Sequence, residues 1–158
     1  PHADQITMID RTMTANETYN LIRNSDCFVS LHRSEGFGLG LAEAMALGTP
    51  VISTGWSGNM DFMSDDTVWL VKHRLVKVKP DEYPFGDGQR WASASVADAA
   101  KKMQAVWQNR EATRAKAEAA RRSATRQLSP RAVGLKFLDR LETGPAAEMF
   151  ARLSKIPA

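Results

Sequence analysis

The sequence predicts an α/β fold with a Rossmann-like parallel sheet flanked by helices. Two features of the 158-residue chain predict this fold class. Short apolar segments alternate with helix-forming segments, and a glycine-rich turn at residues 36–40 joins one such segment to a helix. Because parallel strands need a crossover between them, this alternation is typical of doubly wound sheets.

The expected strands are short runs with β-branched and aromatic residues, the composition of strands buried in a parallel sheet. They cover residues 5–10, 27–32, 50–54 and 67–72. Pro50 fits the third run because proline is tolerated at the start of a strand. Helices are expected at residues 15–24 and 39–47, and Gly48 is a suitable stop for the second helix. Residues 27–54 therefore form a βαβ unit.

The second half of the chain is expected to be mainly helical. Residues 95–126 are rich in alanine and carry one apolar stripe, formed by Ala100, Met103, Val106 and Trp107. Ser129 and Pro130 are typical of a helix start. The buried side of that last helix is expected to comprise Val133, Phe137, Leu138 and Leu141. Residues 72–89 have few helix signals and are expected to form an ordered loop or hairpin insertion, whose role the sequence leaves open.

The composition is that of one ordinary globular domain. Hydrophobic residues make up 43% and charged residues 25% of the chain, and 158 residues suit one domain rather than two. No apolar run approaches the ~20 residues that span a bilayer, and the N-terminus lacks a signal-peptide pattern. We therefore expect a cytoplasmic protein.

The residues that commonly bind metals are not spaced as ligands. His32 and His73 have no ligand-spaced partners, and Asp65 and Asp66 fit a turn better than a D-x-D metal motif. Cys27 lies in an apolar run and is expected to be a small buried hydrophobe rather than a nucleophile. The sequence predicts neither a metal nor another cofactor.

Charge is unevenly distributed along the chain. Residues 1–100 carry 8 Lys/Arg against 13 Asp/Glu, a net charge of −5, whereas residues 101–158 carry 13 against 5, a net charge of +8. The basic half is either a solvated helix face or a peripheral contact with anionic lipids at the inner face of the membrane. Nucleic acid is not expected as a partner, because aromatic residues are not interleaved with the charges as a stacking platform requires.

The most informative segment is the glycine-rich turn between two glutamates. Parallel sheets bind ligands beyond the carboxyl ends of their strands, and a helix N-terminus there attracts anions. Glu35 precedes this turn, and Glu43 follows Leu39 by roughly 6 Å along the helix axis at 1.5 Å per residue. A carboxylate beside a phosphate repels it, so these glutamates are expected to accept hydrogen bonds from hydroxyls at the two ends of a diphosphate. A nucleotide sugar has this layout.

Other site classes fit the turn less well. The dinucleotide fingerprint fails because Leu41 stands where the third glycine belongs, and the P-loop fails because no Gly-Lys-Ser/Thr is present. A glycosidase pair needs carboxylates on opposite sides of the scissile bond. A tight strand-to-helix turn with a merely solvent-facing Glu43 stays open as an alternative.

Residues 35–53 closely resemble the E-x7-E signature of retaining glycosyltransferases of the GT-B fold, in the group 1 or family-four class. Their sequence is E-G-F-G-L-G-L-A-E-A-M-A-L-G-T-P-V-I-S. The resemblance covers roughly residues 5–140. It includes residues 19–29, 57–63 and 83–92, of which the last two resemble a bacterial subgroup of these enzymes.

This resemblance implies roles for the residues of the turn. Glu43 would bind the ribose hydroxyls, and Glu35, the candidate catalytic residue, would bind the hydroxyls of the transferred sugar. The backbone of four residues would hold the diphosphate and the sugar: Gly36, Phe37, Gly38 and Leu39. Retention would follow from same-face transfer, in which the departing diphosphate helps to deprotonate the acceptor hydroxyl.

Two further loops lie beyond strand ends. The resemblance places residues 11–14 near the nucleobase, where Arg11 or Met13 would pack on the ring, although an ordinary solvent loop is an equal alternative. Ser57 and Asn59 would reach the sugar or the acceptor, or would simply cap a short helix.

The resemblance also implies a domain organisation. Residues 1–142 would be a nucleotide-sugar donor-binding domain that is incomplete at its N-terminal side, followed by a tail at 143–158, with the N-terminal acceptor domain absent. The Arg and Lys pair that normally binds the diphosphate would also be missing, so the fragment alone is expected to be inactive. A non-catalytic nucleotide-sugar-binding or interaction module of the same fold is the alternative. The donor base and sugar, and the acceptor (glycan, lipid-linked or small molecule), stay unspecified.

Overall fold

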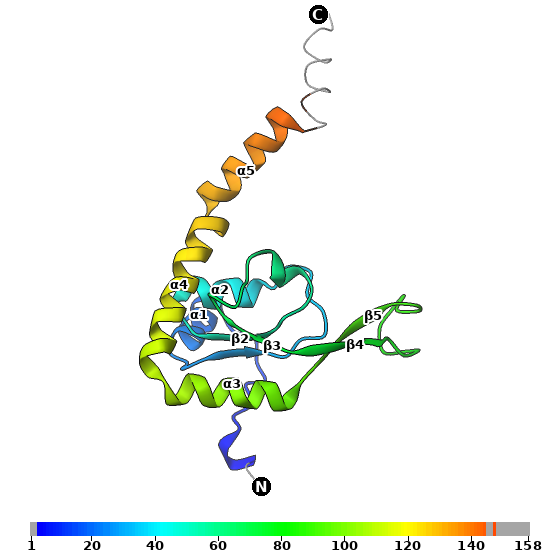
Figure 1. Ribbon diagram of the computed structural model, residues 1–158, viewed down its shortest axis with the longest axis vertical. Helices are drawn as coiled ribbons and strands as arrows, with labels where there is room; N and C mark the ends of the chain where they lie inside the picture. Colours follow the sequence, from blue (N-terminus) through cyan, green and yellow to red (C-terminus); the bar gives the residue numbers. More distant parts are fainter. Residues whose placement is uncertain (1–2, 145–146, 148–158) are drawn as a thin grey trace, which may run out of the picture.

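A three-stranded parallel sheet forms the centre of the molecule in a computed structural model that describes residues 3–144 and 147 (Figure 1). The strands are β1 (Phe28–Ser30), β2 (Val51–Thr54) and β3 (Trp69–Val71), in the order β1-β2-β3. Phe28 pairs with Val51, and Ile52 pairs with Trp69. These strands confirm three of the four expected segments, and the α/β fold with a parallel sheet flanked by helices is confirmed.

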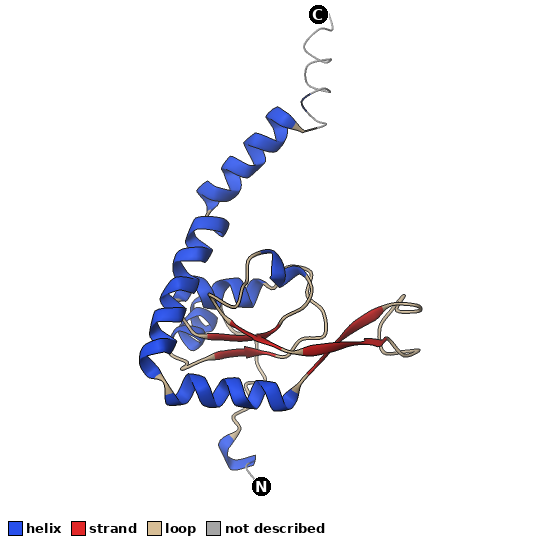
Figure 2. Ribbon diagram, viewed as in Figure 1, coloured by secondary structure: helices blue, strands red, loops and turns tan. Residues whose placement is uncertain are grey.

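Helices cover both faces of this sheet (Figure 2). The α-helices are α1 (Ala15–Arg23), α2 (Leu39–Leu47), α3 (Val96–Gln108), α4 (Arg110–Leu128) and α5 (Pro130–Thr143). Two short 3-10 helices are η1 (Ala3–Gln5) and η2 (Gly58–Asp61). Neighbouring residues of β2 point to opposite faces, so Val51 packs with α1, α2 and α4 while Ile52 packs with α3. The result is a three-layer arrangement of helix, sheet and helix.

The expected first strand, residues 5–10, does not form. Its N-terminal end lies in η1, and Ile6 and Met8 are 74% and 85% exposed. A strand is stable only when its backbone pairs with a neighbour. In the described part of the chain β1 pairs with β2 alone, so this segment has no partner despite its apolar composition.

The segment at residues 72–89 forms most of an antiparallel hairpin, one of the two expected alternatives. Strand β4 (His73–Lys77) pairs with β5 (Arg90–Ala94), and His73 lies opposite Ala94. The hairpin projects from the end of the parallel sheet (Figure 1). It is fastened to the body where the Ala92 amide donates to the Arg33 carbonyl over 2.8 Å.

The C-terminal helices differ from the prediction in two ways. The expected helix at 95–126 is divided at Asn109, whose side chain accepts from the Ala112 amide and so starts α4. The inward face of α3 carries Ala99 and Val106. Of the expected apolar stripe only Val106 is buried, and three of its members are exposed: Ala100, Met103 and Trp107.

The prediction for the last helix was right about its start and wrong about its buried face. Ser129 caps α5 by accepting from the Ala132 amide, and Pro130 occupies the first turn. Its predicted core residues are exposed or half-exposed: Val133, Phe137, Leu138 and Leu141. Figure 1 shows the reason, since α5 extends away from the sheet and only its beginning lies near other elements.

In the described part of the chain, no helix has the length and apolarity that crossing a membrane requires.

Candidate functional site

The glycine turn between β1 and α2 has an open helix N-terminus. Gly38 precedes α2 with a φ of 92°, a conformation that disfavours other residues. A Cβ at this position would lie 3.0 Å from the Leu41 side chain and 3.3 Å from the Cβ of Asn59. No side chain caps α2, which leaves its first-turn amides available to an anion.

The loop after β2 holds this turn in place. The Ser57 hydroxyl donates to the Glu35 carbonyl over 2.6 Å and accepts from the Glu35 amide over 3.0 Å. The Gly58 amide also donates to the Glu35 carbonyl over 3.0 Å. A Cβ on Gly58 would overlap the carbonyl group of Gly36, so the two loops touch backbone to backbone. They therefore behave as one unit at the carboxyl edge of the sheet.

The backbone of Ser57 is strained, and the hydrogen bonds of its hydroxyl offset that strain. Its φ of 83° is unusual for a residue with a side chain, and such strain costs about 1–3 kcal/mol. The hydroxyl does not cap η2, the role considered for it from the sequence. It orients the backbone on which Glu35 sits, a role that sequence reasoning missed because the two residues are 22 positions apart.

Asn59 is the polar residue beneath the turn. It is completely buried, and its amide nitrogen donates to the Thr54 carbonyl over 3.1 Å. Its Oδ1 is buried without a hydrogen-bond partner among the described residues. An unpaired buried acceptor costs about 1–3 kcal/mol, so this position favours a donor such as a water molecule.

The two glutamates differ in their surroundings. Glu35 is half-buried, and its carboxylate receives no hydrogen bond or ion pair from the described residues. The Glu43 carboxylate accepts from the Tyr19 hydroxyl over 3.3 Å, which joins α2 to α1. No local pattern in the sequence marked Tyr19, because it is 24 positions away from Glu43.

An apolar groove of about 610 Å³ lies beside Glu43, between α2 and the junction of α4 and α5. Phe37 and Leu39 line it and are largely exposed. The Phe37 ring also packs against Phe62, with 5.0 Å between ring centroids. Both residues of the turn thus present apolar side chains that are partly exposed to solvent.

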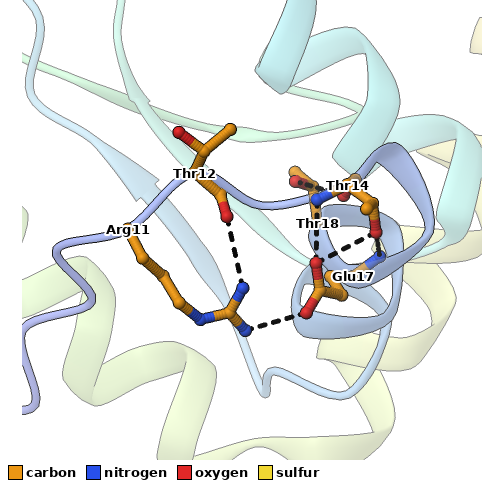
Figure 3. Close-up of polar contacts among 5 residues, drawn as sticks. All are labelled: Arg11, Thr12, Thr14, Glu17 and Thr18. Atoms are coloured by element: carbon orange, nitrogen blue, oxygen red, sulfur yellow. Dashed lines mark hydrogen bonds and ion pairs between the residues drawn. The ribbon is translucent and has the colours of Figure 1, made fainter.

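The loop that carries Arg11 and Met13 is fastened to the start of α1 (Figure 3). The Arg11 guanidinium lies 2.8 Å from a Glu17 carboxylate oxygen, and the other oxygen of Glu17 accepts from the Thr14 amide over 2.8 Å. The Arg11 hydrogen bond, followed by that from Thr14, holds the pKa of Glu17 below its ordinary value of 4.5. Met13 is half-buried. A role for this loop at the nucleobase stays a prediction.

Arg33, just before Glu35, is directed to the hairpin. Its guanidinium lies 4.5 Å from the centre of the Trp91 ring and 3.7 Å from the Glu82 carboxylate. Both arginines close in sequence to the site loops, Arg11 and Arg33, are therefore paired with glutamates.

The potential metal ligands are dispersed. Among residues 3–144 and 147, no three His, Cys, Asp or Glu residues gather as a metal site. The His32 ring nitrogens lie 3.2 Å from the Ser30 hydroxyl and 3.1 Å from the Trp56 carbonyl, so this ring fastens β1 to the loop after β2. Burial raises the pKa of the Cys27 thiol to about 11, which keeps it protonated and unreactive at neutral pH.

Comparison with known proteins adds one positive finding. The family described as "Glycosyl transferases group 1" matches residues 2–82, just over half of the chain, and this span contains the whole turn with both glutamates. No curated protein matches significantly. The chain belongs to the group 1 glycosyl transferases.

Proposed function

We propose that this chain contains the donor site of a retaining glycosyltransferase of the GT-B fold and family-four class, and that residues 35–43 bind a nucleotide-diphosphate sugar. The observation that carries this proposal is the uncapped N-terminus of α2, preceded by a turn whose backbone is fixed by Ser57 and Gly58. Oriented amides of this kind bind diphosphate without reorganisation. The E-x7-E spacing supports the same reading.

The glutamates recognise hydroxyls on either side of that diphosphate. Glu43, held by Tyr19, accepts from the ribose hydroxyls, and the free carboxylate of Glu35 accepts from the hydroxyls of the transferred hexose. Glu35 thereby orients the anomeric carbon for transfer. The departing diphosphate takes the proton of the acceptor hydroxyl, so no side-chain nucleophile is required.

The diphosphate needs more positive charge than the turn supplies. Arg11 and Arg33 are paired with Glu17 and Glu82, which leaves the amides of α2 as the main attraction. We expect another part of the parent protein to complete the site with cations and to bind the acceptor, and we propose no metal or other cofactor. Donor affinity of this chain alone is therefore weak, and its own catalysis is expected to be negligible. A cytoplasmic location also stays a prediction.

Two glutamate variants test the assignment. Glu43→Ala should weaken the binding of the preferred nucleoside diphosphate and of its sugar conjugate by about 10–100-fold, the value of one or two hydrogen bonds to a charged group. Glu35→Ala should weaken the nucleotide sugar alone. Binding is followed by NMR titration with UDP, GDP and ADP and their glucose or mannose conjugates.

Glu142→Ala is the matched control, because Glu142 is an exposed glutamate on α5. It should leave both affinities unchanged. Equal losses of free nucleotide binding in Glu35→Ala and Glu43→Ala would contradict the separate roles. If the wild type and both glutamate variants bind a nucleotide equally well, that outcome would favour the alternative, a nucleotide-binding module that recognises its ligand at other residues.

A further inference from the structure

Helix α5 presents an exposed apolar stripe. Val133, Phe137 and Leu141 are four positions apart, so they lie on one side of the helix. Val133 is 51% exposed, Phe137 is 63% exposed, and the neighbouring Leu138 is 53% exposed. We name these four residues the α5 stripe. A contiguous apolar surface of this kind marks a contact with a partner or with a membrane.

Two cations lie beside the α5 stripe. Lys136 follows Val133 by three positions. Arg140 follows Phe137 by the same interval, so each cation is next to an apolar residue on the helix surface. Asp139 is two positions from Phe137 and therefore lies on the opposite side of the helix. An apolar side with cations at its margin and an acid on the far side is typical of a helix that lies in a membrane interface.

The cations of this region have no acidic partners among the described residues. The ion pairs of the described part of the chain end at Arg122 in α4. Further along, the Lys136 ammonium donates to the neutral Gln127 carbonyl over 3.4 Å. Residues 126–141 carry four Lys/Arg and one Asp, a net charge of +3, whereas residues 1–100 have a net charge of −5. An anionic surface would therefore attract α5 and repel the body of the molecule.

The position of α5 makes this surface accessible to a flat partner. The helix extends away from the sheet, and only its beginning lies near other elements (Figure 1). A projecting helix can lie on a flat surface along most of its length. A second copy of α5 fits less well, because two segments with a net charge of +3 would repel each other.

We propose that α5 binds the surface of an anionic phospholipid bilayer. The α5 stripe inserts among the headgroups, while Lys136 and Arg140 bind lipid phosphates. Burial of apolar side chains supplies one part of the affinity, and the attraction between the cations and the anionic lipids supplies the other. Neither part requires a nucleotide, so this surface acts independently of the proposed donor site.

Co-sedimentation of the full chain with vesicles tests this proposal. Vesicles of equal parts phosphatidylcholine and phosphatidylglycerol should bind the chain. Vesicles of phosphatidylcholine alone should bind it about tenfold or more weakly, because they lack the anionic lipid. Added salt should also weaken the binding, since it screens exposed charges. Equal binding to both kinds of vesicle, or binding to neither, would overturn the proposal.

Phe137→Gln and its matched control Leu135→Gln separate the α5 stripe from the rest of the helix. Both residues are exposed, at 63% and 58%, but Leu135 is two positions from Phe137 and lies on the other side. Phe137→Gln should weaken binding to the anionic vesicles about tenfold, the value of one large apolar side chain. Leu135→Gln should leave it unchanged. Equal losses in the two variants would overturn the assignment of the stripe. Circular dichroism checks that both variants keep the fold.

A second pair of variants tests the cations. The double variant Lys136→Gln/Arg140→Gln should weaken binding about 25-fold, since each cation near an anionic surface contributes about fivefold. The double variant Arg74→Gln/Lys77→Gln is the matched control, because it removes the same charge from two exposed residues of β4. It should change the affinity little. Equal losses would mean that the vesicles respond to net charge alone, and α5 would lose its role.

The remaining outcomes separate this proposal from its rival and from the proposed function. A dimer that forms without lipid and that Phe137→Gln dissociates in analytical ultracentrifugation would place a second copy on the α5 stripe and overturn the lipid contact. Nucleotide shifts in residues 36–41 without any vesicle binding would overturn the lipid contact and leave the donor site standing. Vesicle binding by a chain whose turn responds to no nucleotide would support the lipid contact and overturn the proposed function alone.

Discussion

Helices α2 and α5 are both marked by local sequence signals, yet only α2 has a buried face. Leu41, Ala44 and Met45 of α2 lie in the core against β2 and α4. The apolar residues of α5 are mostly exposed, although the helix starts with a serine cap and a proline. Local residues decide where a helix begins, whereas burial depends on what the rest of the chain places beside it.

The largest contrast between the two helices should come from a matched pair of leucine truncations. Leu41 is 2% exposed and Leu138 is 53% exposed. Leu41→Ala should lower the free energy of unfolding by about 2–5 kcal/mol, and Leu138→Ala should change it by less than about 0.5 kcal/mol. Urea denaturation measures both values. A comparable loss in Leu138→Ala that grows with protein concentration would show that α5 is buried against another copy in solution.

A glycine pair should give effects of opposite sign. Gly58→Ala forces the new methyl group against the Gly36 backbone and should cost about 1–3 kcal/mol, with weaker nucleotide binding. Gly134 has open space around its Cβ position. Gly134→Ala should therefore increase the helix content and stabilise α5 by up to about 1 kcal/mol, the difference in helix propensity between the two residues. Urea denaturation and circular dichroism at 222 nm report these changes. Equal effects at the two positions would contradict the predicted difference between the site loop and α5.

The smallest expected effect is a pH dependence of the stability that Asp98 of α3 contributes. The Lys102 ammonium and the Lys72 amide hold the pKa of Asp98 below its ordinary value of 3.8 and so fasten α3 to the end of β3. Because the folded pKa is lowered, this stabilisation is complete above about pH 4. It is lost as the pH falls through the folded value. Asp98→Asn should therefore be slightly less stable than wild type at pH 7, and the difference should shrink as the pH falls below about 4. A difference that is larger at pH 3 than at pH 7 would contradict the assignment.

The parts of the fold that the sequence predicts well are those with local causes. Residues 39–47 form α2 with the expected bounds because Gly38 and Gly48 punctuate a run of helix formers. The segment at 5–10 has strand composition and no strand, since a partner cannot be read from composition. The division of the helix at 95–126 had a local signal in Asn109, a good N-cap residue that the alanine-rich pattern concealed.

The candidate site likewise has a part that the sequence predicts and a part that only the fold brings together. Glu35, Glu43 and the turn between them form a continuous stretch, so their spacing was visible in the sequence. Ser57 and Tyr19 reach these glutamates from other elements, and only the folded sheet brings them together. The contact between Arg33 and Trp91 has the same origin, because these two residues are far apart along the chain.

The most direct test of the account is an NMR titration of the wild-type chain with UDP, GDP and ADP, with the corresponding nucleosides as controls. The account predicts that at least one diphosphate shifts the amide signals of residues 36–41, and that its nucleoside does not. The expected affinity is weak, so millimolar ligand is required. If no diphosphate shifts these amides, or if nucleoside and diphosphate shift them equally, the turn does not bind the diphosphate and the central claim is wrong.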